Sequence, residues 1–131
     1  MLLPHDTTIV VTDGQKLRLL RNTGTEFHLA LTELPHPDVH GDVAGTSRHE
    51  HTGGDKQDHQ EASYGLAVAK WLNHAIAAGD MGSLFVIAPP RALGELRQHY
   101  SEPLKKKLVG EMAKEHTNDT LHILQQVLRD A

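Results

Sequence analysis

The most constraining feature of this sequence is a run of five apolar residues, Leu84–Ala88, followed at once by two prolines. The run is too short for a typical helix and rich in strand-forming residues, so it predicts a fully buried strand. Pro89 and Pro90 end that strand, and a helix can begin at Arg91. A buried strand that leads directly into a helix indicates an α/β fold, in which ligand sites usually lie at the carboxyl ends of strands.

Further strands and helices are expected on both sides of this strand. The β-branched segment Thr8–Thr12 is followed by Asp13 and Gly14, a strong hairpin signal that predicts a return strand over residues 16–20. A third strand is expected over residues 26–31. Apolar periodicity then predicts a long helix over residues 58–78. The remaining predictions are short helices over residues 91–99 and 101–106, a strand over 108–112, and a final helix capped by Thr117 or Asn118.

A length of 131 residues predicts one domain, spanning residues 1–131. Within it, a polar segment at about residues 35–57 has no apolar periodicity and reads as a long loop. A loop of this length inside a compact domain is either functional or disordered. Because few of its side chains can pack, little opposes its conformational entropy, and we expect it to be mobile in the isolated protein.

Composition excludes several classes of function. The formal net charge of −4 argues against a general nucleic-acid binder held by phosphate contacts, although eleven histidines could offset it in mild acid. The chain has no cysteine, which fits a reducing compartment. Its first residues contain neither a basic region nor a long apolar run, so we expect a cytoplasmic protein without a membrane partner.

Candidate chemical sites are weak. His49-x-His51 and His36-x3-His40 have chelating spacing, but a closed zinc site needs a tighter ligand set, so solvated loop histidines are favoured and no metal site is assigned. Nucleases of the ribonuclease H type need converging carboxylates, and the first strand offers only Asp13. Phosphate-loop and dinucleotide motifs are absent, so no cofactor is expected. Lys105–Lys107 together with Arg91 and Arg97 could form a basic patch, although a lysine run is more often a solvated face.

Several motifs together resemble the bacterial host attachment protein family. They include Thr12-Asp13-Gly14 near the start, His59-Gln60-Glu61-Ala62 and Trp71-Leu72 in the predicted long helix, the stretch from Leu84 to Arg91 with Leu93-Gly94, and Glu111-x2-Lys114-Glu115-His116-Thr117. That family is similar to the middle domain of archaeal and eukaryotic peptide-chain release factors. The resemblance implies a ribonuclease H-like mixed sheet of five strands in the order 3-2-1-4-5, with helices packed on it. The apolar pattern also predicts this strand order, with Leu84–Ala88 parallel to Ile9–Val11 at the centre of the sheet and the long helix from Asp58 covering one face.

The resemblance also indicates where binding residues would lie. In release factors, the loop before the long helix carries a Gly-Gly-Gln tripeptide that acts at the peptidyl-transferase centre. The corresponding stretch here is Gly53-Gly54-Asp55-Lys56-Gln57, in which two residues separate the glycine pair from Gln57. Two extended residues would displace the amide by roughly 7 Å, so no catalytic residue is assigned and an enzyme is not favoured. The predicted binding residues are Gly53, Gly54, Lys56, Gln57, His59, Arg91, Arg97 and Lys105.

Three functions therefore remain open at the level of sequence. The first is a non-enzymatic cytoplasmic module that docks on the ribosome or on structured RNA through the loop at 35–57. The second is a protein-interaction factor in attachment to host cells, acting as a homo-oligomer. The third is a histidine-dependent metal-binding protein. The sequence favours the first two and does not rank them.

Overall fold

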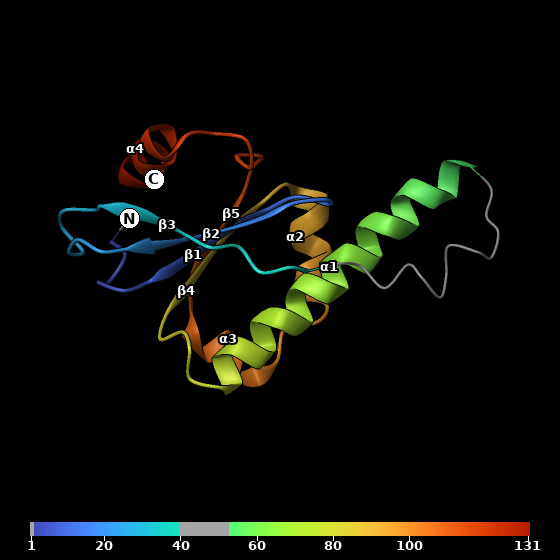
Figure 1. Ribbon diagram of the computed structural model, residues 1–131, viewed down its shortest axis with the longest axis horizontal. Coiled ribbons are helices and arrows are strands. Elements are labelled where there is room, and N and C mark those ends of the chain that lie inside the picture. The colour runs from blue at the N-terminus through green and yellow to red at the C-terminus, as the bar shows by residue number, and fades with distance from the viewer. Residues whose placement is uncertain (1, 40–52) are drawn as a thin grey trace.

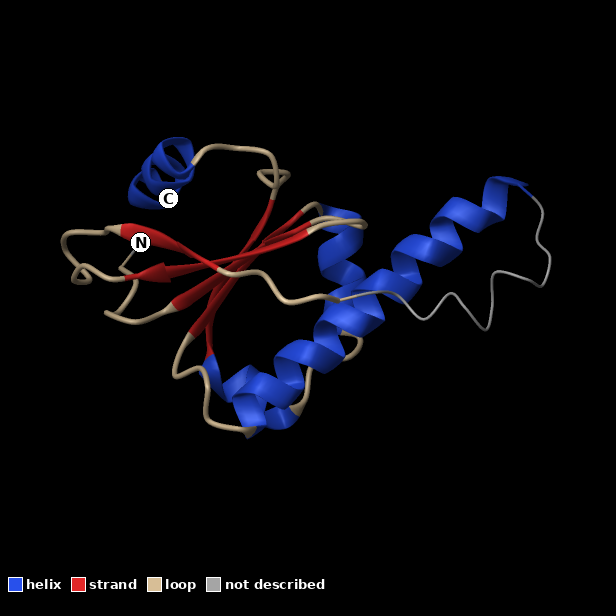
Figure 2. Cartoon of the chain, viewed as in Figure 1, coloured by secondary structure: helices blue, strands red, loops and turns tan. Residues whose placement is uncertain are grey.

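The computed structural model of this chain describes residues 2–39 and 53–131, and side chains in the second part from Gln60 onward. Within these residues, five strands form one mixed sheet in the order β3-β2-β1-β4-β5, which confirms the predicted fold class and strand order (Figures 1 and 2). β2 is antiparallel to both β1 and β3, whereas β4 is parallel to both β1 and β5. The strands are β1 Thr8–Thr12, β2 Leu17–Asn22, β3 Leu31–Leu34, β4 Leu84–Ala88 and β5 Leu108–Ala113.

Helices cover both faces of the sheet. The helices are α1 Gly53–Ala77, α2 Pro90–Arg97, α3 Glu102–Lys107 and α4 Leu121–Asp130. On one face, Val10 and Val86 belong to a buried cluster to which α1, α2 and α3 contribute. On the other face, Ile9 and Phe85 pack with Leu124 of α4. Successive residues of a strand point to opposite faces, so β1 and β4, which are buried along their whole length, supply both clusters.

The junction between β4 and α2 follows the sequence prediction closely. Pro89 is extended, with φ −58° and ψ 155°, and stands at the N-cap of α2. Pro90 is the first residue of the helix, where the missing N–H would have no intrahelical partner in any case. The two prolines therefore end a buried strand and begin a helix within two residues.

The predicted third strand over residues 26–31 is wrong, because β3 occupies Leu31–Leu34. The side chain of the fully buried Asn22 organises the preceding loop. Its Oδ1 accepts the N–H groups of Gly24 at 3.0 Å and Ala30 at 3.2 Å, and its Nδ2 donates to the carbonyl of Leu3 at 2.9 Å. These bonds replace the ladder that alternation over residues 26–31 had suggested, and pairing with β2 begins only at Leu31.

Two helix starts also differ from prediction. α1 begins at Gly53, five residues before the expected start, so the glycine pair is helical rather than part of a turn. The first turns of α1 extend beyond the sheet (Figure 1), where no core imposes an apolar stripe on the sequence. The remainder of the predicted loop, residues 40–52 with its predicted mobility, lies outside the described residues. At α4 the cap is Thr120, whose hydroxyl accepts the N–H of Ile123 at 3.2 Å, and not Thr117 or Asn118.

Candidate functional site

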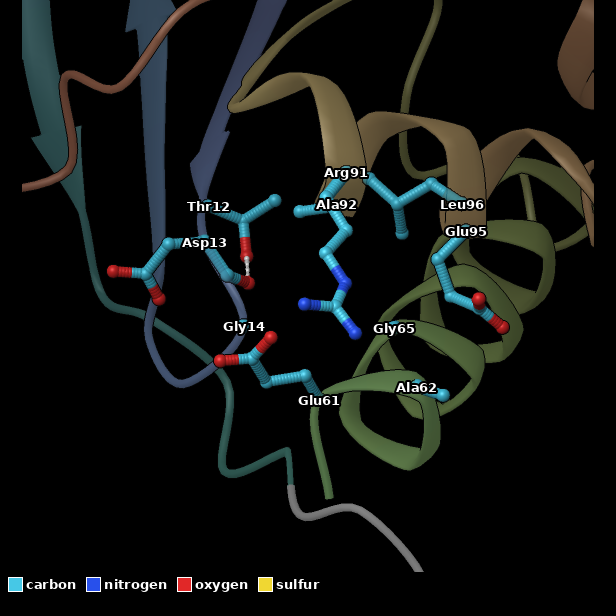
Figure 3. Close-up of a pocket in the computed structure, with 10 residues that line it drawn as sticks. All are labelled: Thr12, Asp13, Gly14, Glu61, Ala62, Gly65, Arg91, Ala92, Glu95 and Leu96. Atoms are coloured by element: carbon cyan, nitrogen blue, oxygen red, sulfur yellow. Dashed lines mark hydrogen bonds between the residues drawn. The ribbon is translucent and has the colours of Figure 1, made fainter. Parts of the chain in front are cut away.

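A pocket lies at the carboxyl ends of the parallel strands β1 and β4 (Figure 3). From β1 the chain continues to β2 on one side, and from β4 it continues to β5 on the other, so this is the point where the strand order reverses. Open α/β sheets bind ligands at such switch points. The cavity measures about 70 Å³, and we call it the β1–β4 pocket. It is lined by Thr12, Asp13, Gly14, Glu61, Ala62, Gly65, Arg91, Ala92, Glu95 and Leu96.

The turn between β1 and β2 forms one wall of this pocket. Oδ1 of Asp13 accepts the backbone N–H groups of Gln15 and Lys16, both at 2.7 Å, and the hydroxyl of Thr12 donates to the carbonyl of Lys16 at 2.6 Å. A side chain at Gly14 would place its Cβ 2.6 Å from Cγ of Glu61. Glycine at this position therefore lets the turn approach α1 closely enough to close the pocket.

The opposite wall is the contact between α1 and α2. A Cβ at Gly65 would lie 2.9 Å from Cγ of Glu95, so the absence of a side chain brings the two helices together. Arg91, the second residue of α2, extends its side chain across the pocket (Figure 3). Its guanidinium points toward the carboxylate of Glu61, which comes from the adjacent helix.

The electrostatic character of this end of the molecule is acidic. A neighbouring hollow shares Asp13, Glu61 and Arg91 with the β1–β4 pocket and adds Glu115. Of the described residues that line the two hollows, four are carboxylates and one, Arg91, is a cation. An excess of negative charge opposes the binding of phosphate groups at this site.

Carboxylates at this site are also held by the protein itself. Besides the two bonds that Asp13 accepts, Oε1 of Glu115 accepts the N–H of Thr117 at 2.7 Å. Within the part of the chain that the structure describes, no group of three or more histidine, cysteine, aspartate or glutamate side chains could hold a metal ion. The histidine pair His49 and His51 lies outside the described residues.

The structure does not bring all the predicted binding residues together. Gly53, Gly54, Lys56, Gln57 and His59 lie in the first turns of α1, where the structure describes the backbone alone. Arg91 lies just after the carboxyl end of β4. It lines the β1–β4 pocket together with Glu61 of α1. Lys105 precedes the amino end of β5. Because β4 and β5 are parallel, Arg91 and Lys105 lie at opposite ends of the sheet and are not brought together.

Arg97 and Lys105 each contact a carboxylate. Arg97 donates to Oε1 of Glu111 from Nε at 3.0 Å and from Nη2 at 2.7 Å, and this hydrogen bonding raises the pKa of Arg97. Oε2 of Glu111 accepts the hydroxyl of Tyr100 at 3.0 Å. Nζ of Lys105 donates to Oε1 of Glu102 at 3.2 Å. Both cations are therefore partly neutralised where they stand.

Sequence reasoning missed the carboxylates of the β1–β4 pocket. The sequence indicates Asp13 as a hairpin residue, as a lone carboxylate and as part of a family motif, and Glu61 only as part of a family motif. One signal could have placed Asp13: the carboxyl ends of the parallel strands β1 and β4 meet at one sheet edge, so the residue after β1 lies beside the residues that follow β4. Glu61 carries no such signal, because its position depends on how α1 crosses the sheet.

The sheet order and the switch-point pocket define this chain as an α/β domain with a candidate site at the carboxyl ends of its parallel strands. Its sequence matches the family model of Bacterial archaeo-eukaryotic release factor family 12 over residues 6–128, and the protein belongs to that family. The match runs from just before β1 into α4, which confirms the release-factor part of the resemblance and leaves the host-attachment part unconfirmed. A search of curated proteins finds no match to this chain. None of the helices among the described residues is both long and apolar enough to span a bilayer.

Proposed function

We propose that this protein is a non-enzymatic module of translation that docks on the ribosome. The observation that carries the proposal is the match to a release-factor family across residues 6–128, which includes every strand of the sheet. A fold alone would not support this function, because one fold hosts many activities. The family match adds a relation to proteins whose name refers to the termination of translation.

The first turns of α1 are the part of the described chain best placed for docking. They extend away from the sheet and its packed helices (Figure 1), so a partner can reach them without displacing the core. Gly53, Gly54, Lys56, Gln57 and His59 all lie there. The β1–β4 pocket, with Arg91, stands beside the next turn of the same helix at Glu61.

A binding role is proposed in preference to catalysis of peptide release. The release-factor tripeptide places glutamine directly after two glycines in a loop. Here the glycine pair lies in a helix, and Gln57 stands about one helical turn beyond Gly53. A helical backbone at this point cannot present the amide as an irregular loop does, so Gln57 is proposed as a contact residue.

Co-sedimentation with ribosomes tests this proposal. Purified protein is centrifuged through sucrose with ribosomes at low and raised salt, and we expect a fraction to pellet with the ribosomes and to fall as salt increases. Lys56→Glu should reduce the pelleted fraction by severalfold. Lys106→Glu, an exposed position in α3 at the far end of the sheet, is the matched control and should pellet like the wild type. Protein that stays in the supernatant at every salt concentration would refute ribosome docking.

A further inference from the structure

A groove of about 610 Å³ adjoins the hollow that contains Glu115, since Gln15 lines both. Three segments that are distant in sequence form it, residues 15–18, 36–39 and 117–120, and Tyr64 of α1 completes the lining. Its volume falls within the usual range for small-ligand sites, roughly 300–1,000 Å³. The groove is much larger than the β1–β4 pocket, and it is large enough to hold a nucleoside.

The walls of the groove are held in place by hydrogen bonds within the protein. Nη1 of Arg18 donates to the carbonyls of Thr117 at 3.0 Å and Asp119 at 2.5 Å, while Nε and Nη2 bind the carboxylate of Glu33 at 3.0 and 2.8 Å. This bonding to Glu33 raises the pKa of Arg18. Nζ of Lys16 donates to Oδ1 of Asn118 at 3.1 Å. A ligand would thus meet a preorganised surface and lose little affinity to ordering it.

Two exposed amide side chains of this lining, those of Asn118 and Gln15, remain available to a ligand. Asn118 uses its amide oxygen for Lys16, which leaves two N–H donors on an exposed side chain. Gln15, also exposed, adds a second amide.

Tyr64 supplies a half-buried aromatic ring to the same groove. Burial, and then the charge of Asp13, raises the pKa of its phenol to about 12. The ring therefore carries a neutral hydroxyl under physiological conditions. An aromatic face beside amide donors and acceptors is the combination with which proteins hold unpaired bases, since every base has a stacking face and a hydrogen-bonding edge.

We propose that this groove binds one unpaired nucleotide of an RNA strand, with the base on Tyr64, its edge at the amides of Asn118 and Gln15, and its phosphate near Lys16. The formal charge of the lining is balanced, because Lys16 and Arg18 are offset by Asp38 and Asp119. Balance suits a single nucleotide with a neutral base better than a long stretch of phosphate backbone. The inference rests on the proposed function and deepens it, because it names unpaired RNA as the chemical partner.

Fluorescence anisotropy with short, labelled, single-stranded oligouridylate and oligoadenylate tests the groove in the full chain. Wild-type protein should bind at least one of them. Tyr64→Ala should weaken binding by about tenfold or more, whereas Tyr64→Phe, which keeps the ring, should bind nearly as the wild type. Asn118→Ala should weaken binding severalfold, and its exposed position keeps the fold intact. Lys106→Ala, on α3 at the far end of the sheet, should have no effect.

Two results would overturn the proposal that the groove binds RNA. One is an absence of binding to either oligonucleotide by the wild type. The other is binding that is unchanged in both Tyr64→Ala and Asn118→Ala, with thermal melting showing that both variants are folded. Ribosome co-sedimentation separates the two proposals. If the protein pellets with ribosomes but binds no oligonucleotide, only the proposal that the groove binds RNA is refuted. If it binds an oligonucleotide through Asn118 but does not pellet with ribosomes, only the proposal of ribosome docking is refuted.

Discussion

Gly24 lies very close to the backbone of the loop that follows it. A Cβ built there would lie 2.1 Å from the carbonyl oxygen of His28 and 3.0 Å from the N–H nitrogen of Ala30. Backbone atoms cannot move aside as the end of a flexible side chain can. We therefore expect Gly24→Ala to lower the free energy of unfolding by about 1–3 kcal/mol, as measured by urea denaturation.

Gly94 provides the matched control for that substitution. It lies inside α2, and a Cβ there would meet no atom within 4 Å. Alanine favours a helix interior over glycine by up to about 1 kcal/mol, so Gly94→Ala should leave stability unchanged or raise it. Equal losses in the two variants would mean that the loop around Gly24 is not packed as described.

Both tyrosines of the chain should titrate late. Burial, followed by Asp13, raises the pKa of Tyr64 to about 12, and burial, followed by the charge of Glu111, also raises the pKa of Tyr100. A phenol whose folded pKa exceeds its unfolded value of about 10 contributes stability that is complete below pH 10 and is lost as the pH rises toward the folded value.

We accordingly expect the ultraviolet absorbance of tyrosinate to stay low at pH 10 and to rise only above about pH 11. Tyr64→Phe should make the fall in stability between pH 10 and pH 12 shallower than in the wild type. At pH 7 both proteins carry a neutral ring at this position, so their urea midpoints should be similar. Half-ionised tyrosine at pH 10 in folded protein would contradict the buried environment of these rings.

At the scale of elements, the two parallel strands β4 and β5 differ in what surrounds them. Val86 in β4 is fully buried, whereas Val109 in the edge strand β5 is 44% exposed. Val86→Asp would bury a carboxylate without a partner, at a cost of several kcal/mol against a typical total stability of about 5–15 kcal/mol. We expect it to prevent folding, which circular dichroism and gel filtration would reveal.

Val109→Asp introduces the same side chain into a neighbouring strand and serves as the control. Because water can reach position 109, the melting temperature of the Val109→Asp protein should lie no more than a few degrees below that of the wild type. A Val86→Asp protein that melts cooperatively, like the wild type, would show that β4 is not the centre of the core.

For the whole molecule, stability and docking should be separable. Buried clusters of described residues lie on both faces of the sheet, and the sequence of residues 40–52 is polar with no apolar periodicity. Replacing residues 40–52 with a glycine–serine linker of equal length should therefore leave the melting temperature nearly unchanged. We expect the same replacement to abolish co-sedimentation with ribosomes, because the segment adjoins the start of α1. A large drop in melting temperature would show that this segment belongs to the core.

The sequence by itself determined the framework of this protein. The apolar run Leu84–Ala88 and the β-branched run Thr8–Thr12 predict the two central strands correctly, since strands buried on both faces are rich in apolar and β-branched residues. Pro89 and Pro90 predict the start of α2 to within one residue, because proline restricts the backbone locally. Together with the family resemblance, these signals predicted the sheet order as well.

Tertiary structure alone decided the features that depend on distant contacts. β3 begins at Leu31 because the buried amide of Asn22 organises the loop before it, and α1 begins at Gly53 where no core imprints a pattern on the sequence. The candidate sites belong to the same class. Glu61 meets the turn at Gly14 only because α1 crosses the sheet there, and the wall at Thr117 faces Tyr64 only because Arg18 holds it. The residues of a segment restrict the backbone of that segment. A pocket forms where separate segments pack together, so the sequence of any one of them does not encode it.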